Sequence, residues 1–170
     1  MSLEMDVFCL LLLIRILYQM YINREQNDHW NYFYYTIAWA CVYLFMDAIW
    51  IMNVKHLLTF SKIQSGIFNS FYFCSLAMLV CSWYVYVQKT LHSAVLKHKK
   101  ILVLTFIPLI FFIGSSLLSY WTHGLFVIDQ AGNYHRGKLL PFYFLILFAY
   151  ILYLSIKAGY LSKKAKNYLY

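Results

Sequence analysis

The chain has 170 residues, of which 63% are hydrophobic and only 12% are charged. Its mean hydropathy is +0.62, whereas a soluble domain of this size needs far more polar surface to cover its core. The composition therefore excludes an ordinary soluble globular domain and predicts an integral membrane protein. The formal net charge of +8 comes mainly from lysines that lie between and after the apolar segments.

Five apolar segments follow one another along the chain, and each has about the length of a membrane-spanning helix. They cover residues 6–22, 32–53, 66–88, 101–120 and 139–161. A helix rises 1.5 Å per residue, so about 20 residues cross the roughly 30 Å of hydrocarbon in a bilayer. Lipid cannot satisfy free backbone groups, and the strict alternation typical of strands is absent, so we expect helices. The predicted fold is an all-α bundle of five transmembrane helices, forming a single domain over residues 1–170.

The basic residues predict how the bundle lies in the membrane. Two parts of the chain are the most basic, the connection after the third segment and the C-terminal tail: Lys89, Lys97, Lys99, Lys100, Lys157, Lys163, Lys164 and Lys166. With Arg15 left aside, nine basic residues fall on their side of the membrane and four on the other. Cytoplasmic loops carry an excess of lysine and arginine, so we expect the N-terminus outside and the C-terminus in the cytoplasm. The bilayer is then the expected partner, and nucleic-acid binding is not expected because topology accounts for the charge.

The sequence contains no motif that predicts an enzyme. The four cysteines lie inside the predicted spans and form no CxxC pair: Cys9, Cys41, Cys74 and Cys81. We interpret them as small apolar packing residues. HExxH, GxSxG and phosphate-binding loop motifs are absent, so we expect no catalytic residue, cofactor or metal. His123, His135 and Asp129 leave acid–base chemistry or zinc binding as open alternatives.

Two charged residues interrupt the apolar spans. Arg15 lies near the middle of the first span, and Asp47 lies in the outer half of the second. A charge in hydrocarbon is costly unless it is paired or faces a cavity. If the first helix runs inward and the second outward, a long arginine side chain bridges their difference in depth, which predicts an Arg15–Asp47 ion pair. Two alternatives stay open: Asp47 lines a cavity that binds a ligand from outside, or Arg15 alone extends to the membrane surface.

Further polar and aromatic residues occur at the depth of Asp47, including Ser115, Ser116 and Ser119, whereas the inner half offers few beyond Thr105 and Ser155. This asymmetry predicts a pocket that opens outward and argues against a transporter site at the midplane. The predicted ligand-binding residues are Asp47, Trp50, Asn69, Tyr72, Trp121, His123, Asp129, Tyr134, His135 and Arg136. We expect a small polar or zwitterionic ligand, because Asp47 suits a cationic group and Arg136 suits a carboxylate or phosphate.

The external loop 121–138 forms the rim of this predicted pocket. LFVID favours β structure, QAGN is typical of a turn, and YHRG is a second extended run, so the loop predicts a small hairpin. In the alternative interpretation the hairpin only caps the bundle, and Asp129 pairs with Arg136.

The segment FVIDQAGNYHRG, the run DVFCLLLLIRILY and the position of Asp47 ahead of Trp50 resemble one family of membrane proteins. These are the membrane-embedded N-terminal sensor regions that precede diguanylate cyclase output domains in signalling proteins of low-GC Gram-positive bacteria. The resemblance covers most of the chain. The matched positions are Asp47, Asp129, Asn133, Tyr134, His135, Arg136 and Gly137.

The resemblance implies a multi-pass protein of the bacterial cytoplasmic membrane that binds a small extracytoplasmic molecule. It would signal to a cytoplasmic output domain or partner protein. The chain ends shortly after the fifth span, whereas the family continues with an output domain, so we expect an excised membrane region or a stand-alone protein with a signalling partner. Alternative functions are a small membrane transporter or transporter subunit, and a scaffold subunit of a membrane complex. The oligomeric state stays open, with a homodimer as one alternative.

Overall fold

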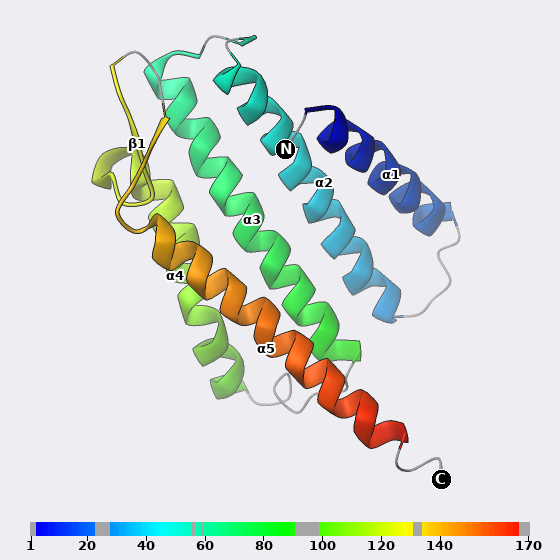
Figure 1. Cartoon of the computed structure of the whole chain (residues 1–170). Coiled ribbons are helices and arrows are strands. Elements are labelled where there is room, and N and C mark those ends of the chain that lie inside the picture. Colours follow the sequence, from blue (N-terminus) through cyan, green and yellow to red (C-terminus); the bar gives the residue numbers. More distant parts are fainter. Residues whose placement is uncertain are drawn as a thin grey trace.

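The computed structural model describes residues 3–22, 28–55, 57–58, 60–90, 99–130 and 134–166. These residues form five α-helices and a short two-stranded hairpin between the last two helices (Figure 1). The elements in chain order are α1 (Leu3–Ile22), α2 (Asp28–Val54), α3 (Lys62–Thr90), α4 (Lys99–Thr122), β1 (Phe126–Ile128), β2 (Tyr134–Arg136) and α5 (Leu140–Lys166). The predicted all-α bundle and the predicted hairpin are both confirmed.

Four of these helices are long and apolar enough to cross a membrane. They are Leu3–Ile22, Asn31–Asn53, Lys62–Thr90 and Leu140–Lys157. In α4, the apolar helical segment found among the described residues is shorter and covers Phe106–Thr122. Each segment predicted from the sequence coincides with one helix to within a few residues at either end.

α3 lies at the centre of the bundle (Figure 1). It packs against α2, α4 and α5, and α1 packs against α2. The helices alternate in direction, so the start of α1, the start of α3 and the hairpin lie at one end, which we call the outer end after the predicted orientation. The ends of α3 and α5 lie at the opposite, inner end. The alternation matches the predicted order of the loops.

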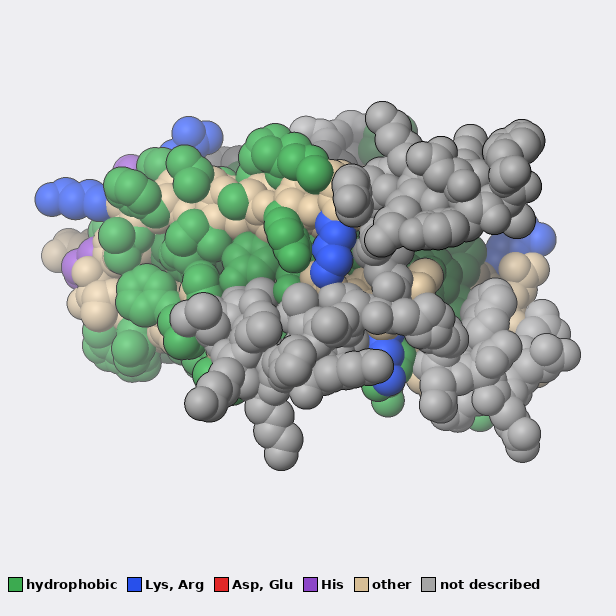
Figure 2. Space-filling view, turned by 90° about the horizontal axis from the view of Figure 1, so that it is seen from below, with side chains coloured by type: hydrophobic (Ala, Val, Ile, Leu, Met, Phe, Trp, Pro, Cys, Tyr) green, Lys and Arg blue, Asp and Glu red, His purple; other side chains and the backbone are tan. Residues whose placement is uncertain are grey.

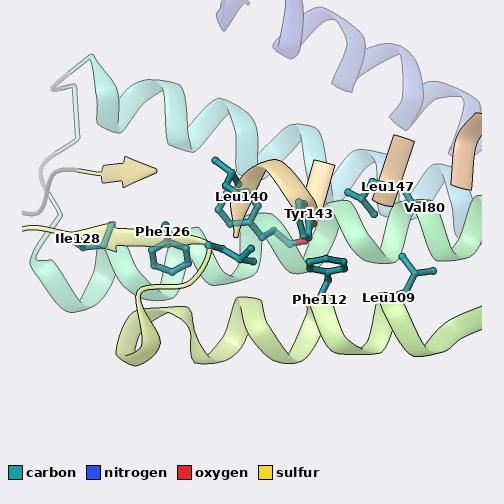
Figure 3. Close-up of a cluster of buried hydrophobic side chains, with 10 residues drawn as sticks. Val80, Leu109, Phe112, Phe126, Ile128, Leu140, Tyr143 and Leu147 are labelled. Atoms are coloured by element: carbon teal, nitrogen blue, oxygen red, sulfur yellow. The ribbon is translucent and has the colours of Figure 1, made fainter. Parts of the chain in front are cut away.

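A cluster of buried hydrophobic side chains joins α3, α4 and α5 to the hairpin (Figure 3). The hairpin inserts Leu125, Phe126 and Ile128 into this cluster, so it is part of the core rather than a loose loop. The remaining members are Phe73, Val80, Leu109, Phe112, Leu140, Tyr143 and Leu147.

Tyr143 is the polar anchor of this cluster. Its side chain is fully buried, and its hydroxyl donates a hydrogen bond of 2.5 Å to the backbone carbonyl of Phe73 on α3. Its ring meets Phe73 and Phe112 edge to face, with centroids 5.5 Å and 5.1 Å away. Tyr143 therefore fixes the position of α5 against α3 and α4.

Tyr143→Phe removes this hydrogen bond but keeps the ring. We expect it to lower the free energy of unfolding by about 1 kcal/mol, because one buried hydrogen bond is lost. Thermal unfolding of the protein in detergent measures the change. Tyr18→Phe on the exposed face of α1 is the matched control and should have no measurable effect. Equal effects of the two substitutions would contradict the anchoring role of Tyr143.

Large apolar side chains are exposed along the outer helices of the bundle. Leu11, Ile110 and Phe148 expose 61%, 62% and 65% of their surfaces, respectively. Figure 2 shows the molecule from below, where hydrophobic side chains cover much of the coloured surface and a few Lys and Arg side chains are visible among the described residues. Such extensive apolar exposure is unfavourable in water but favourable in lipid.

The inner half contains a polar contact that the sequence analysis did not predict. The Lys157 ammonium on α5 donates a hydrogen bond of 2.6 Å to Oε1 of Gln88, which is fully buried on α3. The Ser155 hydroxyl bonds to the Ile151 carbonyl of its own helix, and the side chain of Thr105 lies outside the described residues. The polar asymmetry between the two halves is therefore weaker than predicted, although the inner contact only joins two helices.

Candidate functional site

A cavity of about 440 Å³ lies at the outer end of the bundle, between α2, α3, β2 and the start of α5. We call it the outer cavity. Five residues predicted to bind a ligand line it: Trp50, Asn69, Tyr72, Tyr134 and Arg136. The other lining residues are Phe73, Gly137, Leu140, Pro141 and Phe144. The fold therefore brings half of the predicted site into a single hollow.

Three aromatic side chains from three elements form one wall of the outer cavity. Trp50 on α2 stacks against Tyr72 on α3, with ring centroids 6.3 Å apart. Trp50 also meets Tyr134 of β2 edge-on, with centroids 6.0 Å apart. These rings offer an apolar surface and π faces that attract a cation.

Asn69 supplies a buried hydrogen-bond acceptor at the outer cavity. The residue is only 2% exposed, and its side-chain amide donates a hydrogen bond of 2.8 Å to the Ser65 carbonyl one turn earlier. Its Oδ1 has no hydrogen-bond partner among the residues that the structure describes. An unsatisfied buried acceptor costs on the order of 1–3 kcal/mol. Asn69 therefore places an unused acceptor next to the cavity, buried beneath its surface.

The register of the hairpin places Tyr134 and Arg136 at the cavity. β1 pairs antiparallel with β2, with Phe126 opposite Arg136 and Ile128 opposite Tyr134. Cross-strand partners share a face, so these four side chains lie on the same side, and the two apolar ones are buried in the core. Burial raises the pKa of the Tyr134 hydroxyl, and the charge of Arg136 lowers it in part. The hydroxyl thus stays protonated at neutral pH and is able to donate a hydrogen bond.

Gly137 lets the hairpin approach the chain that follows α4. Its N–H donates a hydrogen bond of 2.9 Å to the Leu125 carbonyl, and the Leu139 N–H donates one of 2.9 Å to the Gly124 carbonyl. A Cβ atom at position 137 would lie 2.2 Å from the Gly124 carbonyl oxygen. Only glycine allows this approach between two backbones. Gly137 therefore sets the position of Arg136.

Asp47 is not among the residues that line the outer cavity. It is buried on α2 and interacts with the side chain of Tyr72. The Tyr72 hydroxyl is also 3.2 Å from the Tyr43 hydroxyl, close enough for a hydrogen bond. Asp47 was expected to lie at the bottom of the pocket and to contact the ligand. In the structure, the carboxylate interacts with Tyr72, which lines the cavity, whereas Asp47 itself does not.

The predicted ion pair between Arg15 and Asp47 is not formed within the described part of the chain. The Arg15 side chain is exposed on α1. The reason is helical geometry. Leu13 and Leu17 belong to the more buried stripe of α1, and Arg15 is two residues from each, about 200° around the helix. Arg15 therefore lies on the face opposite the stripe that packs against α2.

Four other predicted site residues lie outside the outer cavity. Asp129 and His135 contact each other on the hairpin, with 3.4 Å between Oδ2 and Nε2, and both side chains are exposed. A solvent-exposed pair of this kind contributes little stability. Trp121 and His123 lie exposed at the end of α4, and Trp121 exposes 72% of its surface. Asn133 lies outside the described residues.

His123 has a structural role that its predicted ligand-binding role did not anticipate. It follows α4 directly, has a φ of 56°, and its N–H donates to the Ser119 carbonyl at 2.8 Å. A residue in this left-handed conformation commonly ends a helix, and glycine adopts it at least cost. His123 therefore turns the chain from α4 toward the hairpin.

His123→Gly should raise the free energy of unfolding by up to about 1 kcal/mol, because glycine relieves the left-handed strain. Ligand binding should be unchanged, since the His123 side chain does not line the outer cavity. Thermal unfolding and ligand titration of the same variant check both results. Loss of ligand binding with unchanged stability would show that the His123 side chain takes part in ligand binding.

The three serines at the end of α4 satisfy backbone groups instead of forming a cavity wall. The hydroxyls of Ser115 and Ser116 donate to the Phe112 carbonyl at 3.0 Å and 2.7 Å. Ser119 is fully buried, and its Oγ accepts a hydrogen bond of 2.9 Å from the Leu125 N–H. Ser119 thus fixes the start of the hairpin.

Three residues at the start of α5 line the cavity but were not predicted from the sequence: Leu140, Pro141 and Phe144. The sequence did contain a signal for them. The predicted fifth span begins two residues after Gly137, so its first turn has to lie beside the second strand of the hairpin. Apolar residues in a predicted span were assigned to lipid or core and were not considered as cavity walls.

Comparisons with known proteins add no relative to this description. No family model matches the chain, and no curated protein and no solved structure is significantly similar to it. Among the described residues, no group of three or more His, Cys, Asp or Glu side chains is arranged to hold a metal ion.

Proposed function

We propose that the chain is a five-span integral membrane protein of the bacterial cytoplasmic membrane that binds a small extracytoplasmic ligand in the outer cavity. Four long apolar helices, the exposed apolar surface and the basic residues concentrated at the inner end support the membrane placement. With this orientation the outer cavity lies on the extracytoplasmic side.

The observation that carries the ligand-binding proposal is the convergence of three kinds of group on the outer cavity. Asn69 places a buried, unsatisfied acceptor next to it, Arg136 presents a cation, and Trp50 with its neighbouring rings presents an apolar wall. A matching ligand has a hydrogen-bond donor, an anionic group and an apolar or aromatic part. A small zwitterion combines these features, because its ammonium group suits Asn69 and the π faces, and its carboxylate or phosphate suits Arg136.

The proposed consequence of binding is a signal to a cytoplasmic output domain or partner protein. The outer cavity is lined by the first turns of α5, and α5 continues to the basic inner end. A ligand that contacts β2 and α5 together favours one position of α5 over others, provided that it binds that position more tightly. This arrangement suits a sensor more than a transporter with a midplane site.

The experiment is a titration of the protein in lipid nanodiscs with compounds that share one phenyl ring. Phenylalanine is zwitterionic, phenylpropionate is anionic, phenethylamine is cationic and phenylpropanol is neutral. A ligand that binds only the folded protein raises its unfolding temperature. At a ligand concentration one hundred times the dissociation constant, the free energy of unfolding increases by about 2.7 kcal/mol. We expect the zwitterion to stabilise most and the anion next.

Equal shifts for all four compounds would indicate nonspecific partitioning and would contradict the proposal. A larger rise in unfolding temperature with the cation than with the anion would show that Arg136 does not contact the ligand and that only the aromatic wall does.

A further inference from the structure

Arg15 occupies an unusual place for a charged side chain. It lies near the middle of α1, a helix of 20 residues that is long and apolar enough to cross a membrane. The side chain is exposed, and it forms no ion pair within the described part of the chain. In a bilayer, this face of α1 would present a guanidinium group directly to hydrocarbon, which is strongly unfavourable.

Extension of the side chain toward the membrane surface relieves only part of this cost. At 1.5 Å per residue, Arg15 lies about 18 Å from the start of α1 at Leu3 and about 10 Å from its end at Ile22. Helical side chains lean toward the N-terminus of their helix, so Arg15 leans toward the more distant surface. To reach the nearer surface, at the end of α1, the side chain has to point toward the C-terminus of the helix, against this preference.

The residues around Arg15 form a seam suited to a second helix. Most side chains of α1 are exposed, and those on the face of Arg15 recur at spacings of three and four residues: Phe8, Leu11, Arg15, Tyr18 and Ile22. This is the spacing at which two transmembrane helices pack along each other. The face thus has an interface pattern with one charge at its centre.

Among the residues that the structure describes, a second copy of the chain offers this charge no counter-ion. In a symmetric pair joined through α1, the two Arg15 side chains would lie at the same depth and repel each other. Among the described acidic residues, Glu4 and Asp6 lie at the outer start of α1, and Asp28 begins α2 at the inner end. Asp129 lies on the hairpin in contact with His135, and Glu25 lies outside the described residues. Asp47 is buried and interacts with Tyr72, so it is not accessible to a partner's α1.

We propose that α1 docks, along the seam centred on Arg15, against a transmembrane helix of another protein that carries an aspartate or glutamate near its middle. Pairing the two charges removes the unfavourable exposure of each to lipid. The inference rests on the proposed membrane placement but not on the ligand of the outer cavity. It makes the chain a subunit of a membrane complex.

The test uses synthetic transmembrane peptides in phosphatidylcholine vesicles that contain the full chain. The peptides share one leucine–alanine sequence and differ at a single central position, which is Asp, Asn or Ala. Energy transfer between a dye on the C-terminal tail of the protein and a dye on the peptide measures association. We expect the Asp peptide to associate at least about tenfold more tightly than the Ala peptide.

Variants of the protein show whether Arg15 is responsible. Arg15→Leu should reduce association of the Asp peptide to the level of the Ala peptide, and Arg15→Lys should retain most of the preference. Lys62→Leu, which removes an exposed charge at the start of α3, is the control and should change nothing. Equal association of all three peptides, or an unchanged preference in Arg15→Leu, would overturn the proposal.

Two further measurements distinguish the other outcomes. Photobleaching steps of singly labelled protein count the copies in each complex. Two steps for the wild-type protein and one step for Arg15→Leu would assign the seam to a second copy and overturn the proposal. Flotation of the vesicles after an alkaline wash tests the membrane placement itself. Failure of the chain to float would refute that placement, whereas flotation without a peptide preference would refute only the docking proposal.

Discussion

Arg136→Gln is expected to weaken binding of a zwitterionic or anionic ligand by about 10- to 100-fold. Arg136 is the only cationic residue that lines the outer cavity among the described residues, and glutamine keeps hydrogen-bonding capacity while removing the charge. The loss should be largest for the anionic compound and absent for the neutral one. Titration of the variant in nanodiscs with the same phenyl compounds gives these affinities.

Lys138→Gln is the matched control for this prediction. Lys138 is exposed, lies two residues from Arg136 and does not line the outer cavity. Its removal changes the net charge of the hairpin by the same amount. If both variants lose affinity equally, the effect is a long-range attraction of the ligand, and the direct contact with Arg136 is disproved.

Gly137→Ala should be the most destabilising single methyl addition in the hairpin. The new Cβ atom would lie 2.2 Å from the Gly124 carbonyl oxygen and 2.5 Å from the Leu125 carbonyl carbon, both of them backbone atoms. The two segments have to separate, which strains the two hydrogen bonds between them. We expect a loss of about 2–4 kcal/mol in the free energy of unfolding and loss of ligand binding, because Arg136 moves with the hairpin.

Gly114→Ala is the matched control. Gly114 lies inside α4, and a Cβ atom at this position would meet nothing within 4 Å. Alanine in a helix interior should raise stability by roughly 0.5–1 kcal/mol. Thermal unfolding of both variants compares a glycine required by backbone contact with one that is not required. Similar behaviour of the two variants would contradict the role assigned to Gly137.

The sequence predicted the helices and the hairpin because both rest on local patterns. Apolar runs of span length predict helices wherever they pack, and QAGN between two β-prone runs predicts a turn. Trp50, Tyr72 and Arg136 were predicted at one site because helices that alternate in direction bring them toward the same end of the bundle. The structure places all three at the outer cavity.

Depth alone did not predict which way each side chain points. Arg15 and Asp47 were expected to pair because their depths differ little, but Arg15 lies on the far side of α1. His123 and Trp121 were assigned to the rim by position, although His123 ends α4 and Trp121 faces outward. Rotation about a helix axis depends on which apolar stripe packs against a neighbour, and four nearly uniformly apolar helices give only weak signals of that choice.

Labelling of a single cysteine at position 69 tests the central claim, that the outer cavity is open to the exterior and holds the ligand. The four native cysteines are first replaced by alanine, and Asn69→Cys is then exposed to a small membrane-impermeant thiosulfonate from either side of the membrane. We predict modification from the outside only, slowed by phenylalanine, because Arg136 and Trp50 still contact the ligand after this substitution. His135→Cys on the exposed face of the hairpin should be modified from the outside at a rate that phenylalanine does not change. Modification of Asn69→Cys from the cytoplasmic side, or none while His135→Cys reacts, would contradict the account.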